Sequence, residues 1–258
     1  MPEGPQARQV GNTIASFSGR ELVSIIGPKS RKAWDISMPN GIDRVEVKGK
    51  NIFIYMVGGE IIYNHMLMWG WWLPTIEPVT KKRLNTAFYF SDGTNLGYFG
   101  GGTIKVITSG EAEKLKDGLG VDILDAKTSL EAFEEVGKSN LPIGQAVLEQ
   151  SLISGIGNVY KSEGLFIAKI NPLRPANNVT DKEFERIFSF LQPQMRADIK
   201  RPGKMITTTK EAAKGGNWNF VYRRYHQACL LCNTKVERIY QGDRLVRSTY
   251  YCPSCQKE

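Results

Sequence analysis

Four cysteines near the end of the chain are the residues whose types and spacing specify chemistry most plainly. They form two pairs, Cys229-Leu-Leu-Cys232 and Cys252-Pro-Ser-Cys255, with nineteen residues between the pairs. Each pair offers two thiolates to one tetrahedral ion, so the spacing is typical of a zinc ribbon or zinc finger. Two disulfides are the alternative, but an intracellular chain of this size rarely needs them. We therefore predict one structural Zn²⁺ held by all four cysteines.

The second residue could supply a nucleophile. Removal of the initiator Met1 before a small residue such as Pro2 is expected, and it leaves a secondary amine next to Glu3. Such an amine can attack a sugar C1′ and form a charged iminium, the Schiff-base chemistry otherwise performed by lysine. On this feature alone, a chance Met-Pro start is the simpler interpretation.

The charge of the chain favours a polyanionic partner. The sequence has 34 Lys and Arg against 26 Asp and Glu, a formal net charge of +8. From residue 216 to the end it has seven Lys or Arg against three acidic residues. Excess positive charge attracts phosphates without reading sequence. The surplus at the end of the chain therefore favours contact with DNA by this segment, although a solvated basic face is the alternative.

The apolar residues give no sign of a membrane protein. No stretch approaches 18 consecutive apolar residues, and the start MPEGPQARQV has no apolar core of a signal peptide. We therefore expect an intracellular protein with no membrane span and no secretory signal.

The elements that must position these residues change in kind along the chain. A leading helix is predicted over residues 6–17, because Val10, Ile14 and Phe17 follow helical spacing. Short β-rich runs broken by Gly, Asp and Asn follow it, as expected for a sandwich or barrel. These runs cover residues 44–57 (interrupted at 48–50), 60–64, 87–90, 96–99 and 103–107.

The second half of the chain reads as helical. Residues 118–127 form the expected boundary, and helices are predicted over 130–136, 143–152, 159–167 and 181–199. Thr180 and Glu183 have the spacing of a capping box for the last helix, whose apolar stripe includes Phe184, Ile187 and Leu191. Residues 203–218 are polar and glycine-bearing, which is typical of a loop. The chain is thus predicted to be a multidomain α+β protein.

Three separated motifs resemble the formamidopyrimidine-DNA glycosylase and endonuclease VIII family. They are MPEGP at the start, GIGNVYKSEGLF at 155–166 followed by INPLRPA, and RSTYYCPSC at 247–255. The resemblance spans the whole chain and implies three domains. These are an N-terminal catalytic β-sandwich (1–120), a helix–two-turn–helix DNA-binding domain (121–215) and a zinc finger (216–258). It also implies a monomer that acts on damaged double-stranded DNA without a small-molecule cofactor.

The resemblance implies a glycosylase that also acts as an abasic-site lyase. Pro2 would displace a damaged base that has been flipped out of the duplex, and elimination would then nick the strand. Glu3 would be the general acid that assists opening of the sugar ring. Lys50, in the sequence KGKN, would contact a phosphate near the reacting sugar.

The same resemblance implies a set of DNA-binding residues. Asn158 would bind phosphate at a helix start, with Tyr160 and Lys161 as neighbouring candidates, although Tyr160 could simply pack. Arg247 would clamp phosphates with its planar guanidinium. Leu67, Met68 and Trp69 would form a wedge that fills the gap left by the flipped nucleotide, with core packing as the alternative.

Two positions depart from the family pattern. The chain has Gln6 where relatives usually carry glutamate, and an amide cannot exchange a proton as a carboxylate does. The stretch Tyr98–Ile104 (YFGGGTI) lacks the arginine with which the purine-specific branch reads the opposite base. This favours oxidised pyrimidines and hydantoins. Residues 210–218 could instead cap a flipped purine, so 8-oxoguanine or formamidopyrimidine is the alternative lesion.

Two other classes of function compete with the enzyme. A non-catalytic binder of damaged DNA would account for Gln6 and the missing arginine, but not for the combination of Pro2, Glu3 and Lys50. A zinc module that contacts proteins would leave the N-terminal motif unexplained.

Overall fold

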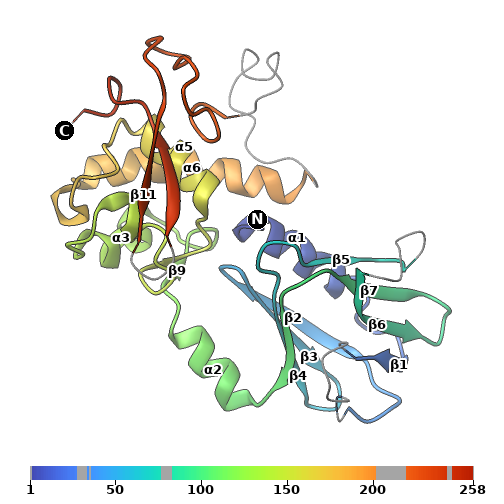
Figure 1. Ribbon diagram of the computed structural model, residues 1–258. Coiled ribbons are helices and arrows are strands. Elements are labelled where there is room, and N and C mark those ends of the chain that lie inside the picture. Colours follow the sequence, from blue (N-terminus) through green and yellow to red (C-terminus); the bar gives the residue numbers. More distant parts are fainter. Residues whose placement is uncertain are drawn as a thin grey trace. The chain divides into compact units, whose positions relative to one another are not determined.

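The computed structural model describes residues 2–27, 34, 36–76, 83–201, 219–242 and 246–257. It divides into two compact units, Met1–Gly118 and Leu119–Glu258 (Figure 1). Sheets dominate the first unit and helices the second, so the α+β class is confirmed. None of the helices in the described part of the chain is both long and apolar enough to cross a membrane.

The first unit is a β-sandwich with a helix at its start, as predicted. One sheet has the order β1-β6-β7-β5 and the other the order β2-β3-β4-β8 (Figure 1). Its core joins apolar residues of both sheets to Ala7, Val10 and Ile14 of α1. The bounds are α1 (Gly4–Ala15), β1 (Leu22–Ile26), β2 (Ile42–Lys48), β3 (Asn51–Met56), β4 (Ile61–His65), β5 (Trp71–Leu73), β6 (Leu84–Phe90), β7 (Asn95–Phe99) and β8 (Thr103–Ile107).

The predicted strands are all present, but three elements of this unit were not predicted. Strands β1 and β5 are short, and the burial pattern of β1 leaves most of its side chains exposed or half-exposed. Helix α2 (Ser109–Asp117) buries only Ala112 among its side chains, so it carries no apolar stripe that a sequence pattern could reveal.

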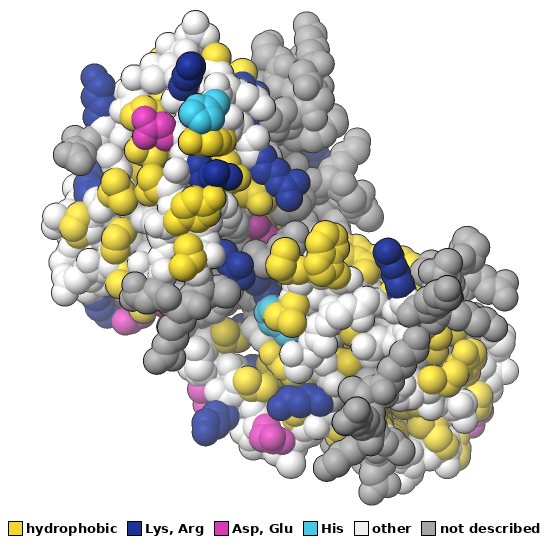
Figure 2. Space-filling view, in the orientation of Figure 1, with side chains coloured by type: hydrophobic (Ala, Val, Ile, Leu, Met, Phe, Trp, Pro, Cys, Tyr) yellow, Lys and Arg dark blue, Asp and Glu magenta, His cyan; other side chains and the backbone are white. Residues whose placement is uncertain are grey.

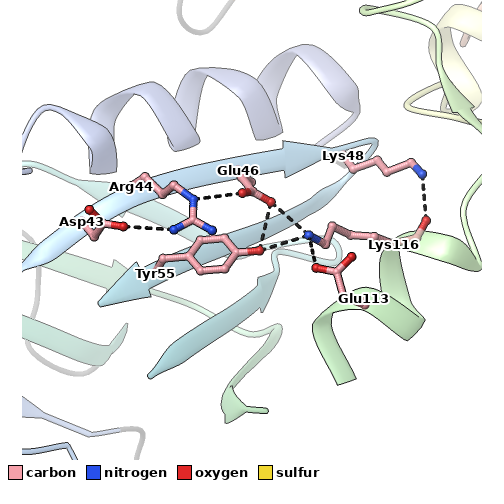
Figure 3. Close-up of polar contacts among 7 residues, drawn as sticks. All are labelled: Asp43, Arg44, Glu46, Lys48, Tyr55, Glu113 and Lys116. Carbon is pink, nitrogen blue, oxygen red and sulfur yellow. Dashed lines mark hydrogen bonds and ion pairs between the residues drawn. The ribbon is translucent and has the colours of Figure 1, made fainter. Parts of the chain in front are cut away.

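Polar contacts fasten α2 to the second sheet (Figure 3). Lys116 Nζ lies 3.2 Å from Glu46 Oε2 of β2 and donates to the Tyr55 hydroxyl of β3 at 3.1 Å. Lys48 Nζ donates to the Lys116 carbonyl at 2.8 Å, near the end of α2. A cation at the C-terminal turn satisfies a carbonyl that the helix itself leaves unpaired. These polar contacts add to the apolar packing of Ala112 and Leu115 against the second sheet.

The second unit contains helices around one core and a small C-terminal hairpin. Helix α6 begins with the predicted capping box, in which Glu183 Oε2 accepts from the Thr180 N–H at 2.9 Å. Phe184, Ile187 and Leu191 are buried in the core. The bounds are β9 (Val121–Asp122), α3 (Ser129–Gly137), α4 (Ile143–Ala146), β10 (Ile153–Ser154), α5 (Asn158–Ile167), η2 (Ala176–Asn178), α6 (Asp181–Ile199), β11 (Glu237–Gln241) and β12 (Arg247–Tyr251).

One helix is shorter than predicted. Helix α4 ends at Ala146, whereas the sequence predicted a helix over 143–152. The side chain of Gln150 donates to the Leu148 and Ile156 carbonyls and accepts from the Gly155 N–H. A side chain that bonds the nearby backbone in this way stabilises a turn in place of helix. The predicted loop over 203–218 lies outside the described residues.

Candidate functional site

The start of α1 fixes the backbone next to Pro2. Glu3 is the N-cap residue of α1, and its side chain accepts from the backbone N–H of Gln6. In return, Gln6 Oε1 accepts from the Glu3 N–H at 2.9 Å. Glu3 is only 1% exposed and Gln6 7% exposed. This reciprocal capping box holds the peptide unit that joins Pro2 to Glu3, so the chain start has a defined direction.

The capping box gives Gln6 a role that its amide can perform. The bond to the Glu3 N–H needs only an oxygen acceptor, and an amide oxygen serves as well as a carboxylate oxygen. The substitution of glutamine for glutamate therefore removes a charge at this position but keeps the hydrogen bond. A structural role at the helix start does not require proton exchange by residue 6.

We expect Gln6→Glu to keep the free energy of unfolding close to that of the wild type, whereas Gln6→Leu lowers it by about 1 kcal/mol. Leucine cannot accept from the Glu3 N–H, which is then left buried without a partner. Denaturant titration of the full chain measures the difference. Equal stability of the two variants would show that the capping box does not hold the chain start.

Lys50 lies in the tight turn between β2 and β3. Gly49 has a positive φ of 61°, and Lys48 pairs with Asn51 across the turn, so Gly49 and Lys50 are its two central residues. Lys50 is half-exposed. The two lysines of the motif thus differ, because Lys48 donates to the end of α2 (Figure 3) while Lys50 lies at the tip of the hairpin.

The predicted wedge residues lie on an exposed turn. Leu67 and Met68 are each 51% exposed and Trp69 is 80% exposed, which excludes the core alternative for them. Gly70 N–H donates to the Met66 carbonyl at 2.9 Å and closes the turn. Three large apolar side chains that remain in solvent are unusual unless they contact a partner.

His65 supports this turn. Its Nδ1 accepts from the Leu67 N–H at 3.2 Å, while Leu67 has a positive φ of 51°. Burial lowers the pKa of His65, and the charge of Lys50 lowers it further, so the ring is neutral near pH 7 and its Nδ1 can accept. The charge of Lys50 at the hairpin tip therefore acts on the His65 ring that supports the wedge turn.

A glycine turn lies directly against the wedge turn. A Cβ placed on Gly100 would lie 2.1 Å from the Trp69 carbonyl oxygen, and one on Gly102 would lie 2.2 Å from the Tyr98 hydroxyl. Both glycines also have positive φ, 85° and 152°. Side chains are thus excluded at Gly100 and Gly102, whereas Gly101 between them is exposed with open space around it.

In the second unit, the side chains at the start of α5 hold the C-terminal hairpin. Lys161 Nζ donates to Thr249 Oγ1 at 2.6 Å and to the Ser248 carbonyl at 3.2 Å. Asn158 Nδ2 donates to Ser248 Oγ at 3.4 Å, and no side chain caps the helix start. These contacts position β12, which begins at Arg247.

Burial separates the sequence-predicted residues of α5 into two groups. Tyr160 has no exposed surface, and its hydroxyl donates to Asp198 Oδ2 at 2.7 Å. Lys161 is 1% exposed. Both side chains are therefore buried and paired within the second unit, and their contact with DNA stays a prediction. Asn158 is 7% exposed, and its Oδ1 has no hydrogen-bond partner among the described residues.

A buried carboxylate joins α5 to the segment that leads into the cysteine knuckles. Glu163 is fully buried and accepts from the N–H groups of Phe220, Val221 and Tyr222 at 2.7 to 3.1 Å. Burial raises the pKa of Glu163, while the three donors favour its charged form. Glu163 could not be distinguished from other acids in the sequence, because its partners lie 57 to 59 residues away.

The four cysteines come together as a metal site. Their Sγ atoms all lie within 4.8 Å of one another, with Cys229 to Cys255 at 3.9 Å and Cys232 to Cys252 at 3.4 Å. Tetrahedral zinc with Zn–S bonds of about 2.3 Å requires sulfur separations of roughly 3.8 Å. The donor set therefore fits one Zn²⁺.

We expect Cys232→Ser to lose most of its metal and to bind an abasic-site duplex more weakly. A structural zinc ion contributes about 10 kcal/mol or more to the folding of small fingers, so three thiolates should not keep this module folded. Atomic absorption and fluorescence anisotropy measure the two effects. Leu231→Ser is the matched control, because Leu231 is 61% exposed in the same knuckle. Full affinity in metal-free protein would contradict the expectation.

Comparisons with known proteins agree along the whole chain. The family model "Formamidopyrimidine-DNA glycosylase H2TH domain" matches residues 119–210. A formamidopyrimidine-DNA glycosylase of Bacillus cereus is 32% identical over 282 residues, covering 99% of both chains. The protein named endonuclease 8 1 of Mycobacterium bovis is 30% identical over 278 residues, covering 99% of this chain and 100% of the relative.

The chain belongs to the formamidopyrimidine-DNA glycosylase and endonuclease 8 family. Its fold is also that of the Lactococcus lactis Fpg protein, solved in complex with DNA that contains an abasic site. That match has a TM-score of 0.81 and 21% identity, and covers all of both chains. The resemblance predicted from three short motifs is therefore confirmed.

Within each unit, the family residues group as the sequence motifs suggested. The first unit carries Pro2, Glu3, Lys50 and the wedge turn, and the second carries Asn158, Arg247 and the cysteines. Sequence reasoning missed the supports His65, Gly100, Gly102 and Glu163. The triple glycine at 100–102 was the one available signal, because consecutive glycines mark a close approach of backbones.

Proposed function

We propose that this family member is a base-excision-repair DNA glycosylase that is also an abasic-site lyase. The observation that carries the proposal is the chain start, where a buried Glu3 caps α1 directly after Pro2. Most chain ends are loosely held, whereas the residue after Pro2 is buried and caps a helix. It suits a terminal amine that must meet a sugar in a fixed orientation.

The reaction proposed for Pro2 begins at the sugar of a flipped nucleotide. The neutral nitrogen gives its electron pair to C1′, and the glycosidic electron pair leaves with the base, which takes up a proton. The attacking nitrogen then loses the proton that it carried. Its electron pair forms the C1′=N bond of the iminium as the C1′–O bond breaks, and Glu3 donates a proton to the ring oxygen. Removal of a C2′ proton expels the 3′ phosphate and nicks the strand.

The remaining residues are proposed to bind and shape the DNA. Lys50, Asn158 and Arg247 would contact phosphates, with Tyr160 and Lys161 as supports behind them. Leu67, Met68 and Trp69 would occupy the space vacated by the flipped nucleotide, for which their exposure suits them. One Zn²⁺ on the four cysteines would hold the hairpin that carries Arg247.

The preferred lesions are proposed to be oxidised pyrimidines and hydantoins. The close packing of Gly100 and Gly102 leaves no side chain there to read the opposite base. Selection by the opposite base should therefore be weak. The loop at 210–218 that could favour purines lies outside the described residues, so 8-oxoguanine stays as the alternative lesion.

Borohydride trapping tests the proposal on duplexes that carry an abasic site, thymine glycol or 8-oxoguanine. We expect a covalent adduct with the abasic site, and faster trapping on thymine glycol than on 8-oxoguanine. Trapping only on 8-oxoguanine would reverse the lesion assignment. Tight binding with no adduct on any of the three substrates would instead identify a non-catalytic binder of damaged DNA.

A further inference from the structure

The surface of the cysteine module carries a stack of rings and a cation that the proposed reaction does not use. We define this stacking ladder as His226, Tyr225, Arg238 and Tyr240. The Arg238 guanidinium carbon lies 4.6 Å from the ring centre of Tyr225 and 5.2 Å from that of Tyr240. The ring centres of Tyr225 and His226 lie 3.8 Å apart, with the ring planes tilted by 48° to each other. The cation thus lies beside two tyrosine rings in one continuous series.

The ladder faces solvent. Tyr240 is 63% exposed and Tyr225 40% exposed, and Arg238 and His226 are also exposed. On the body that includes the C-terminal module, Figure 2 shows hydrophobic and Lys or Arg side chains alternating below a histidine. Most exposed large apolar side chains occur singly. A continuous series of exposed rings and a cation is therefore a candidate binding site.

The strand geometry directs the ladder away from the core. Side chains of a strand alternate between its faces, so Arg238 and Tyr240 of β11 share one face. The other face carries Gln241, which is buried and donates to the Pro172 carbonyl at 3.0 Å. It also carries Glu237, whose carboxylate accepts from the Tyr251 hydroxyl at 2.8 Å. The nearest acid on this strand is thus held on the opposite face.

Hydrogen bonds order the backbone that carries two of the rings. The His226 N–H donates to the Val236 carbonyl at 2.9 Å, and the Val236 N–H donates to the Gln227 carbonyl at 2.9 Å. His226 itself has a positive φ of 63°, which turns the chain sharply beside Tyr225. A surface ordered in this way loses little conformational entropy on binding.

We propose that the stacking ladder is a second nucleic-acid site, which binds an unpaired strand by stacking its bases. Aromatic rings accept any base by its flat face, and cations between the rings contact the phosphates or stack as well. The module has seven Lys or Arg against three acidic residues from position 216 onward, as a polyanion requires. In a duplex the bases already stack on each other, so the site favours single strands.

Fluorescence anisotropy with a labelled twelve-nucleotide oligothymidylate tests the site in the full-length, zinc-loaded protein. We expect Tyr240→Ala and Arg238→Ala each to weaken binding about tenfold, the loss of one stacked base. Tyr240→Phe should bind like the wild type. Lys235→Ala is the charge-matched control, because Lys235 is an exposed cation of the same module outside the ladder, and its effect should be smaller.

The control results decide between stacking and other causes. If Arg238→Ala and Lys235→Ala weakened oligothymidylate binding equally, the loss would come from charge alone, and the proposal would be overturned. Unchanged oligothymidylate affinity in Tyr240→Ala would also overturn it, and would leave a protein partner as the reason for the patch. Borohydride trapping on an abasic duplex should be unaffected by the ladder variants. If the protein gave no trapped adduct but Tyr240→Ala still weakened oligothymidylate binding, the stacking ladder would stand and the proposed reaction would fail.

Discussion

Protein that retains Met1 is expected to give no borohydride-trapped adduct with an abasic duplex, whereas the processed chain is trapped. A retained Met1 converts the Pro2 nitrogen into an amide, whose electron pair is delocalised and no longer nucleophilic. Expression with and without an inhibitor of methionine aminopeptidase yields the two forms from one sequence. Intact mass spectrometry assigns each form, and gel shift of the trapped complex measures the reaction.

The comparison isolates the nucleophile because every residue from Pro2 onward is the same in both forms. Pro2→Gly is the complementary variant, and we expect its adduct to be lost because the ring that orients the nitrogen is absent. The binding of an uncleavable abasic analogue should persist in all forms. A trapped adduct in verified Met1-retaining protein would place the nucleophile on another residue and end the proposed mechanism.

Glu3→Gln is expected to slow strand nicking by about 10² to 10⁴-fold, the usual contribution of a general acid, because opening of the sugar ring must precede elimination. Its amide oxygen can still accept from the Gln6 N–H, so the start of α1 and the free energy of unfolding should change little. Single-turnover assays on a thymine glycol duplex measure the rate, and denaturant titration measures the stability. The variant thus distinguishes proton donation by Glu3 from the hydrogen bond that Glu3 accepts at the start of α1.

Glu21→Gln is the matched control, because Glu21 is an exposed acid of the same unit and loses the same charge. Its rate should equal that of the wild type. If Glu3→Gln nicked the strand at the wild-type rate, ring opening would draw its proton from elsewhere, and Glu3 would be only a helix cap.

The sequence predicted features that depend on short-range patterns. The cysteine spacing predicted the metal ligands because each pair is local, and the capping box of α6 follows from Thr180 and Glu183 alone. The strands of the sandwich alternate apolar residues and glycine-rich turns, which a single sequence displays. Helix α2 was not predicted because only Ala112 is buried, Leu115 packs beside it, and polar contacts supply the rest of its attachment.

The sequence did not predict which polar residues are buried. Tyr160 and Lys161 belong to a motif of DNA-binding residues, yet both lie inside the second unit. Their partners, Asp198 and Thr249, are 38 and 88 residues away. The same holds for the stacking ladder, in which Tyr225 and Arg238 meet only after the knuckles fold. Contacts at long range need the fold itself.

The glycine turn constrains how this enzyme could change its substrates. A larger residue at position 100 would collide with the Trp69 carbonyl, so the wedge turn would have to shift before an opposite-base reader could be introduced there. Variants on that route would have a displaced wedge turn and would still lack a side chain that reads the opposite base. Natural or directed evolution of a new lesion range in this chain should therefore proceed through other loops, with Gly100 and Gly102 unchanged.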